Sequence, residues 1–142
     1  MTNHQINQVK SSWKLVETIE PEAVGSIFYS YLFEIAPGVK PMFRSPIPEQ
    51  SKKLLSMLSY IISKLDRLDD IIDEVVKLSR RHIGYGVREE HYVAVGAALL
   101  LTLEKGLGNA WNEELKHAWG DCYSILSSAM IVASQCVTLD AA

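Results

Sequence analysis

Histidines at positions 4, 82, 91 and 117 are the side chains of this sequence best suited to bind a transition metal. His4 lies near the terminus, His91 in a polar turn, and His117 in a helix whose apolar face is already filled. These positions are typical of solvated histidines. His82 differs, because it follows the apolar residues Val75 and Leu78 at the end of a predicted helix and precedes Gly84. Its position alone favours a structural histidine and leaves a ligand role as the alternative.

The sequence lacks the short motifs typical of side-chain catalysis and nucleotide binding. It contains no G-x-x-x-x-G-K-[ST], G-x-G-x-x-G, G-x-S-x-G, H-E-x-x-H or C-x-x-C pattern. The missing C-x-x-C-H also excludes covalent c-type haem attachment by the usual route. We therefore expect any chemistry to come from a bound cofactor.

The two cysteines, Cys122 and Cys136, lie 14 residues apart in the last predicted helix. A rise of 1.5 Å per residue separates them by about 21 Å, which is too far for a disulfide within that helix. We interpret them as small thiols of the core, with an intermolecular disulfide as the alternative.

Size and composition indicate an ordinary globular protein. The 142 residues, 48% hydrophobic and 22% charged, predict a single domain over residues 1–142. The net charge is -3 and the arginines at 80, 81 and 88 form only a local cluster, so we expect neither nucleic acid nor a membrane as partner. The amino terminus has no apolar signal core, which predicts a cytoplasmic protein.

Apolar residues recur every three or four positions almost throughout, which predicts an all-α chain. Thr2 and Gln5 form a capping-box pattern that opens the first helix. A second helix begins at Pro21 and ends before the sequence "APG". Residues 39–50 contain three prolines and predict a tight, largely non-helical connection.

The second half of the chain predicts further amphipathic helices. One follows Pro48 and runs to Leu65, and the next begins at Ile71 and ends near His82. Residues 90–108 are apolar nearly all round, which predicts a helix at the centre of the bundle. Asn112 caps the last helix, whose expected inner face comprises Leu115, Trp119, Cys122, Leu126, Ala129 and Ala133.

Several stretches together resemble the globin family. "VGSIFYSYLFEIAPGVKPMF" resembles the second globin helix and the corner ending on the phenylalanine that contacts haem, here Phe43. "EQSKKLL" resembles the distal helix, with Gln50 and Leu54 facing the sixth iron site. "RRHIGYGV" resembles the end of the proximal helix with the iron-binding histidine, here His82. The resemblance spans roughly residues 5–135 and implies haem b within a three-over-three helical sandwich that has a short, proline-rich corner before the distal helix.

Bacterial single-domain globins and the globin part of flavohaemoglobins are the globins that this chain resembles, with a secondary likeness to neuroglobin-like bacterial proteins. Tyr29 matches their distal tyrosine. Its O–H and the amide N–H of Gln50 are donors suited to the partial negative charge that bound O₂ develops. Each such bond contributes about 1–3 kcal/mol in a dry pocket, so the resemblance implies tight O₂ binding.

Other residues acquire roles around the cofactor through the same resemblance. The expected contacts are Leu78 and Val87, and the expected cations near the haem propionates are Arg44, Lys53 and Arg81, with ordinary solvated charges as the alternative. Tyr92 matches a tyrosine that hydrogen-bonds toward the proximal histidine in flavohaemoglobin-like proteins. The glutamate that completes that arrangement is Ser134 here, which argues against peroxidase-like activation of oxygen.

The resemblance implies a site for O₂, NO and CO that converts NO to nitrate, with electrons from an external reductase because the sequence has no flavin or nicotinamide motif. Reversible O₂ binding for storage or delivery is the alternative, and a haem sensor is disfavoured because no output domain is evident. No histidine lies between His4 and His82, so a bis-histidine iron cannot form by the familial route. We therefore expect ferrous haem with a vacant or only weakly occupied sixth position.

Overall fold

The computed structural model describes residues 1–43, 45–67, 76–77, 80 and 89–141, with side chains described up to residue 128. Within these ranges the chain forms helices and no strand, which confirms the predicted all-α class. The α-helices are α1 (Asn3–Val16), α2 (Pro21–Ile35), α3 (Ile47–Ser63), α5 (Glu89–Leu107) and α6 (Glu113–Ala141), joined in part by the 3₁₀ helices η1 (Pro37–Met42) and η3 (Gly108–Ala110). The helix predicted from Ile71 to His82 lies largely outside the described residues.

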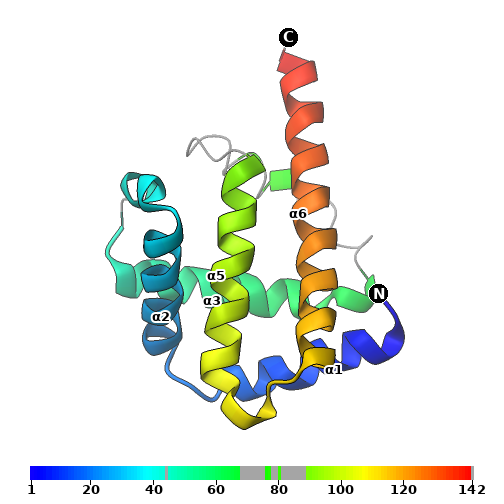
Figure 1. Cartoon of the computed structure of the whole chain (residues 1–142). Helices are drawn as coiled ribbons and strands as arrows, with labels where there is room; N and C mark the ends of the chain where they lie inside the picture. The colour runs from blue at the N-terminus through cyan, green and yellow to red at the C-terminus, as the bar shows by residue number, and fades with distance from the viewer. Residues whose placement is uncertain (44, 68–75, 78–79, 81–88, 142) are drawn as a thin grey trace.

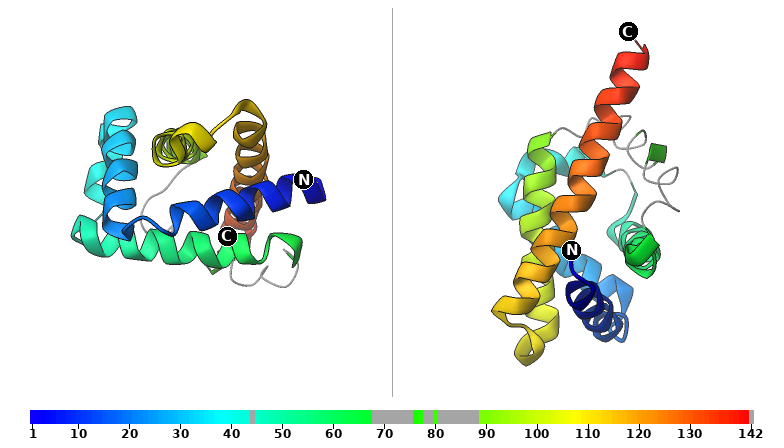
Figure 2. Two further views of the ribbon diagram at one scale, coloured as in Figure 1. Left: turned by 90° about the horizontal axis from the view of Figure 1, so that it is seen from below. Right: turned by 90° about the vertical axis from the view of Figure 1, so that its right-hand side faces the viewer.

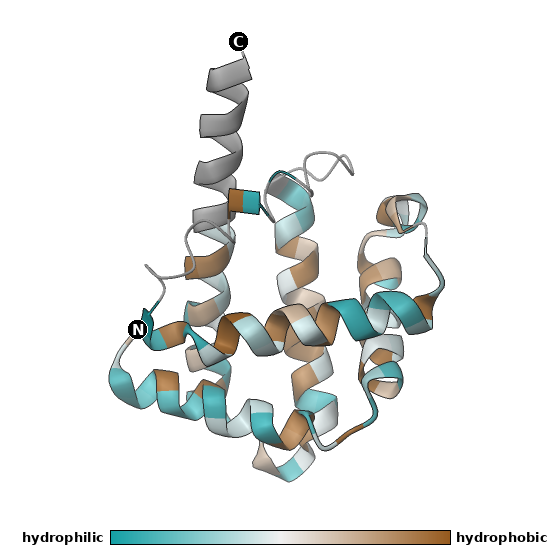
Figure 3. Ribbon diagram, turned by 180° about the vertical axis from the view of Figure 1, so that it is seen from behind, coloured by the Kyte–Doolittle hydropathy of each residue, from teal (hydrophilic) through white to brown (hydrophobic). Residues whose placement is uncertain are grey.

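The described helices form two layers. α2, α5 and α6 stand roughly side by side, and α1 and α3 run across them (Figure 1). Seen from below, α1 and α3 lie next to each other (Figure 2). α2 packs against α3 and α5, and α1 packs against α6. Apolar and polar residues alternate along α1 and α3, as they do in helices with one buried face (Figure 3).

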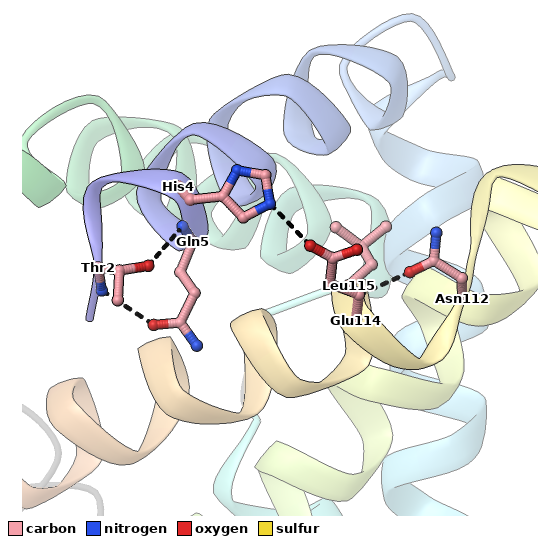
Figure 4. A network of polar contacts seen from close by, with 6 residues as sticks. All are labelled: Thr2, His4, Gln5, Asn112, Glu114 and Leu115. Atoms are coloured by element: carbon pink, nitrogen blue, oxygen red, sulfur yellow. Dashed lines mark hydrogen bonds and ion pairs between the residues drawn. The ribbon is translucent and has the colours of Figure 1, made fainter.

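Polar contacts join the amino end of α1 to α6. Thr2 Oγ1 accepts from the N–H of Gln5 at 3.1 Å and Gln5 Oε1 accepts from the N–H of Thr2 at 2.9 Å, which confirms the predicted capping box. Gln5 Nε2 also donates to Asp121 Oδ2 of α6 at 2.7 Å. His4 Nε2 lies 2.7 Å from Glu114 Oε1 of the same helix (Figure 4). α1 is therefore docked on α6 by its capping residues.

The centre of the α1–α6 packing is a pair of tryptophans. The rings of Trp13 and Trp119 lie 5.9 Å apart between centroids. Trp119 Nε1 donates to Ser12 Oγ and Trp13 Nε1 donates to Ser59 Oγ, both at 2.9 Å. Both indole N–H groups are thus satisfied while the rings are only 2% exposed.

The predicted cap of the last helix is confirmed. Asn112 Oδ1 accepts from the N–H of Leu115 at 2.7 Å, one of the donors that a helix leaves unpaired in its first turn (Figure 4). Leu115, Trp119 and Cys122 are buried as expected, and Leu126 is half-buried. Ala129 and Ala133 lie outside the described side chains. One continuous α6 carries both Cys122 and position 136.

The predicted non-helical connection over residues 39–50 is wrong. Residues up to Met42 belong to the 3₁₀ helix η1, and α3 begins at Ile47, before Pro48. Proline lacks the N–H that an α-helix leaves unpaired in its first turn, so the prolines at 46 and 48 start a helix here instead of interrupting one.

The predicted position of α5 at the centre of the bundle is confirmed, because α5 packs against α2, α6 and α1, but the helix is not buried on all sides. Its inner face is buried, with Leu103 1% exposed, but Val93 is 74% exposed and Ala97 and Leu101 follow it on the outward face. No described helix covers this face. By length and composition α5 is the one described helix that could cross a membrane, yet its inner face packs against α2. The apolar residues of its inner face therefore belong to the core.

α2 and α3 cross at unusually short range at Gly25. A Cβ added to Gly25 would lie 1.9 Å from Ser51 Oγ and 2.1 Å from Ser51 Cβ. Ser51 is 0% exposed, and its hydroxyl donates to the carbonyl of Ile47 at 2.7 Å. Only a residue without a side chain fits at position 25.

We expect Gly25→Ala to destabilise the fold by about 1–3 kcal/mol, because the new methyl group must displace α3. Gly120→Ala is the matched control, since nothing lies within 4 Å of a Cβ there and alanine favours a helix. Combining Gly25→Ala with Ser51→Gly should recover more stability than combining it with Ser51→Ala, which keeps the clashing Cβ. Urea unfolding of the five proteins checks the order. Equal stability for Gly25→Ala and Gly120→Ala would contradict the close crossing.

Candidate functional site

Tyr29 lies on α2 one turn after Gly25 and is only 4% exposed. Its ring centroid is 5.1 Å from those of Phe28 and Phe43, with both pairs edge to face. Phe33, one turn further along α2, lies 5.8 Å away. The phenol of Tyr29 is thus held in a rigid aromatic cluster that joins α2 to the residue after η1.

The hydroxyl of Tyr29 points to the beginning of α3. It donates to the main-chain carbonyl of Gln50 over 3.4 Å, which is long for an O–H···O hydrogen bond. Gln50 itself is half-buried in the first turn of α3. The structure therefore brings together the predicted distal residues Tyr29 and Gln50, but through a backbone oxygen. A stronger acceptor that reached the hydroxyl would readily replace this carbonyl as its hydrogen-bond partner.

Burial keeps the Tyr29 hydroxyl protonated. Burial removes the hydroxyl from water, which disfavours the charged phenolate and raises the pKa of Tyr29 from 10.0 to about 12. At neutral pH this group is a hydrogen-bond donor and a very weak acid. It can orient a polar ligand without surrendering its proton.

A half-buried stripe on α3 lies beside the fully buried one. Gln50, Leu54 and Leu58, spaced by four residues, are half-buried, whereas Ser51 and Leu55 next to them are buried. Leu54 and Leu58 also pack against the core. This stripe provides apolar surface for a flat, largely apolar ligand.

Two predicted cofactor contacts lie at the margin of this region. Phe43 is half-buried and packs on Tyr29 and Phe33. Lys53 is exposed on α3, and its role near a propionate stays a prediction. The predicted residues Arg44, Leu78, Arg81, His82 and Val87 lie outside the described residues, as does the side chain at position 134.

Tyr92, the predicted partner of the proximal histidine, is buried in the first turns of α5. Its main-chain carbonyl accepts a hydrogen bond of 2.5 Å from the hydroxyl of Tyr123 on α6. Burial raises the pKa of the Tyr92 phenol.

Sequence reasoning missed Phe33 and Tyr123. The spacing of four residues between Tyr29 and Phe33 could have placed both rings on one face of a helix. Tyr123 gave no comparable signal, because its partner is 31 positions away in the chain. Contacts of that kind depend on how two helices pack.

We expect the Tyr29 phenol to add stability that is lost at alkaline pH. The unfolded chain ionises this group near pH 10 and the folded chain near pH 12, so its contribution is complete below pH 10 and disappears as the pH rises toward 12. The free energy of unfolding of the wild type should therefore fall more steeply over this range than that of Tyr29→Phe. Tyr60→Phe, at a ring 45% exposed, is the control. Parallel curves for wild type and Tyr29→Phe would contradict the burial of the phenol.

The comparisons with known proteins agree with this geometry. The chain matches the family model described as globin over residues 26–130. It is 33% identical over 145 residues to an anaerobic nitrite reductase of Gossypium hirsutum, covering 91% of each chain. It is 25% identical to the flavohemoprotein of Oceanobacillus iheyensis, with 92% of this chain but 34% of that protein covered. The bacterial globin structure from Campylobacter jejuni has a TM-score of 0.84 and 27% identity, over 96% of this chain and 99% of that one. The resemblance seen in the sequence is confirmed, and this chain belongs to the globin family.

Proposed function

We propose that this globin binds haem b with His82 as iron ligand, takes O₂, NO and CO on the side of Tyr29 and Gln50, and oxidises NO to nitrate. Membership in the family implies haem binding. The observation that supports a reactive gas site is the buried hydroxyl of Tyr29, held by one 3.4 Å hydrogen bond.

The described residues fit a haem group. The half-buried stripe of Gln50, Leu54 and Leu58 and the ring of Phe43 offer apolar contacts, and Tyr29 offers a donor beside them. When bound, haem supplies an iron that holds a diatomic gas and exchanges single electrons with it. The chain supplies the surroundings in which that ligand is oriented.

Tyr29 and Gln50 orient the ligand in this proposal. The long bond of the Tyr29 hydroxyl to the carbonyl of Gln50 costs little to break, and a ligand oxygen that carries partial negative charge is the better acceptor. The amide N–H of Gln50 is a second donor in the same turn of α3. The aromatic cluster excludes water, which strengthens both bonds.

The proposed reaction balances with one electron: NO, O₂ and an electron give nitrate. Both atoms of O₂ join the nitrogen, and no proton is consumed. The electron comes from a partner reductase in this proposal. The likeness to the flavohemoprotein, of which this chain spans 34%, supports a reductase as the source of the electron.

Nitrite reduction is a second candidate, favoured by the name of the Gossypium hirsutum relative. That reaction uses nitrite, one electron and two protons to give NO and water. The phenol of Tyr29, with a pKa raised to about 12, is a poor source of those protons. In this second candidate the protons come from solvent.

We expect Tyr29→Phe to release O₂ faster than the wild type. Loss of a hydrogen bond that contributes about 1–3 kcal/mol should raise the rate of O₂ release by roughly five- to more than a hundredfold. Gln50→Leu removes the amide donor but keeps the carbonyl that Tyr29 contacts, so its release rate should rise as well. Tyr60→Phe is the control with an exposed ring. Stopped-flow displacement of O₂ by CO measures the rates, and an unchanged rate in Tyr29→Phe would contradict the donor role.

Turnover separates the candidate functions. With NADPH and a flavin reductase as electron donor, the wild type in air should consume NO and form nitrate in equal amounts. Tyr29→Phe should be slower, because less O₂ stays bound. Faster conversion of nitrite without O₂ than of NO with O₂ would favour the second candidate. Failure to be reduced again after one turnover would leave reversible O₂ binding as the function.

A further inference from the structure

The outward side of α5 is an apolar surface that no described helix covers. Val93 is 74% exposed and Leu101 is 38% exposed, and Ala97 lies exposed between them at a spacing of four residues. α1 and α3 cross the other side of this helix (Figures 1 and 3). Single exposed apolar side chains are common, but three on one side of a helix form a continuous surface, which is typical of an interaction site.

α6 lies beside this surface and is held there by a close contact. A Cβ added to Gly96 of α5 would lie 2.7 Å from Cε2 of Tyr123, so this ring rests directly on the α5 backbone. The hydroxyl of Tyr123 donates to the main-chain carbonyl of Tyr92 at 2.5 Å. The two helices run antiparallel, so α5 ends where α6 begins (Figure 1). Together they present one surface of fixed shape.

The outward side of α6 offers room and positive charge in place of large apolar side chains. Lys116 and Ser124 are exposed, and Gly120 lies midway between them with nothing within 4 Å of an added Cβ. Glycine weakens a helix relative to alanine, and at Gly25 and Gly96 a close contact accounts for its use. No described residue accounts for it at Gly120. A partner that approaches the α6 backbone closely would do so.

The outward sides of α5 and α6 complement each other in size and charge. α5 carries the large apolar side chains, and α6 carries the open backbone at Gly120. Glu104 is exposed near the end of α5 and Lys116 near the start of α6, and neither forms an ion pair with another described residue. Within one chain both sides point outward and cannot face each other. A second copy, related by a twofold axis parallel to the helices, brings them together.

We propose that this globin associates with a second copy of itself, in a symmetric pair in which α5 of each copy packs on α6 of the other. The apolar surface of Val93, Ala97 and Leu101 is then covered. Glu104 of each copy meets the partner's Lys116, which fixes the relative direction of the two copies. The surface spans only two helices, which is small for a permanent dimer, so the association depends on concentration. The inference is independent of the proposed function.

Sedimentation of the full chain as purified measures the association, in a reducing agent that keeps cysteines from linking two copies. We expect the wild type to change from monomer to dimer as its concentration rises. Val93→Asp should raise the dissociation constant of the dimer about tenfold or more, because the interface would then bury a carboxylate. Leu15→Asp is the matched control, at a side chain 52% exposed on α1, and should leave the constant unchanged.

Exchange of two charges tests whether the contact lies between copies. Glu104→Lys alone and Lys116→Glu alone should each form a weaker dimer than the wild type, since like charges then meet. An equal mixture of the two variants should associate again, because each copy then offers the charge that the other needs. Mixing could not restore an ion pair within one chain.

Urea unfolding at a concentration where the wild type is monomeric reports the folding of each variant separately from its association. A wild type that stays monomeric at millimolar concentration would overturn the inference. A dimer that Val93→Asp leaves unchanged, or a mixture of charge variants that stays as weak as each variant alone, would also overturn it. Slower reduction of Val93→Asp by the flavin reductase, with a wild type that is always monomeric, would assign the surface to the reductase instead.

Discussion

The close crossing of α2 and α3 is the constraint on which the positions of Tyr29 and Gln50 in this globin depend. Gly25 leaves room for no side chain against Ser51, which fixes both the distance and the register of the two helices. Tyr29 follows Gly25 by one turn, and Gln50 directly precedes Ser51. The contact that seats Gly25 on Ser51 therefore also delivers the Tyr29 hydroxyl to the first turn of α3, where it meets the carbonyl of Gln50 at 3.4 Å.

The packing of α5 against α6 also depends on a glycine. Gly96 faces the ring of Tyr123, and the ring's hydroxyl reaches the backbone of Tyr92. In both pairs a glycine gives up helix propensity so that two rigid helices approach closely. Residues that are placed by helix packing in this way hold their positions better than residues on loops. The described polar groups of the site are therefore set by backbone geometry.

Sequence reasoning reached what depends on local spacing and on resemblance. The caps at Thr2 and Asn112 are local patterns, and both are present. Tyr29, Gln50 and Phe43 were predicted from the resemblance. The structure places Tyr29 in contact with both Gln50 and Phe43. The use of the Gln50 carbonyl was not foreseeable, because helical periodicity describes one face of a helix and not the helix that it meets. The prolines around position 47 led to the wrong prediction of a non-helical connection. Prolines are typical both of connections and of helix starts, so the local pattern does not distinguish the two.

The chemistry of the described interior is that of neutral dipoles. Besides the tyrosines, its buried polar side chains are Ser12, Ser51 and Thr102, and no charged side chain is buried there. Such groups attract a polar ligand without adding charge, and they neither gain nor lose protons near neutral pH. Oxidation of NO by O₂ consumes one electron and no proton, whereas reduction of nitrite needs two protons. Because burial raises the pKa of Tyr29 to about 12, this phenol orients a ligand and does not supply protons near neutral pH. In either proposed reaction, Tyr29 therefore contributes orientation of the ligand, and the protons that nitrite reduction needs come from solvent.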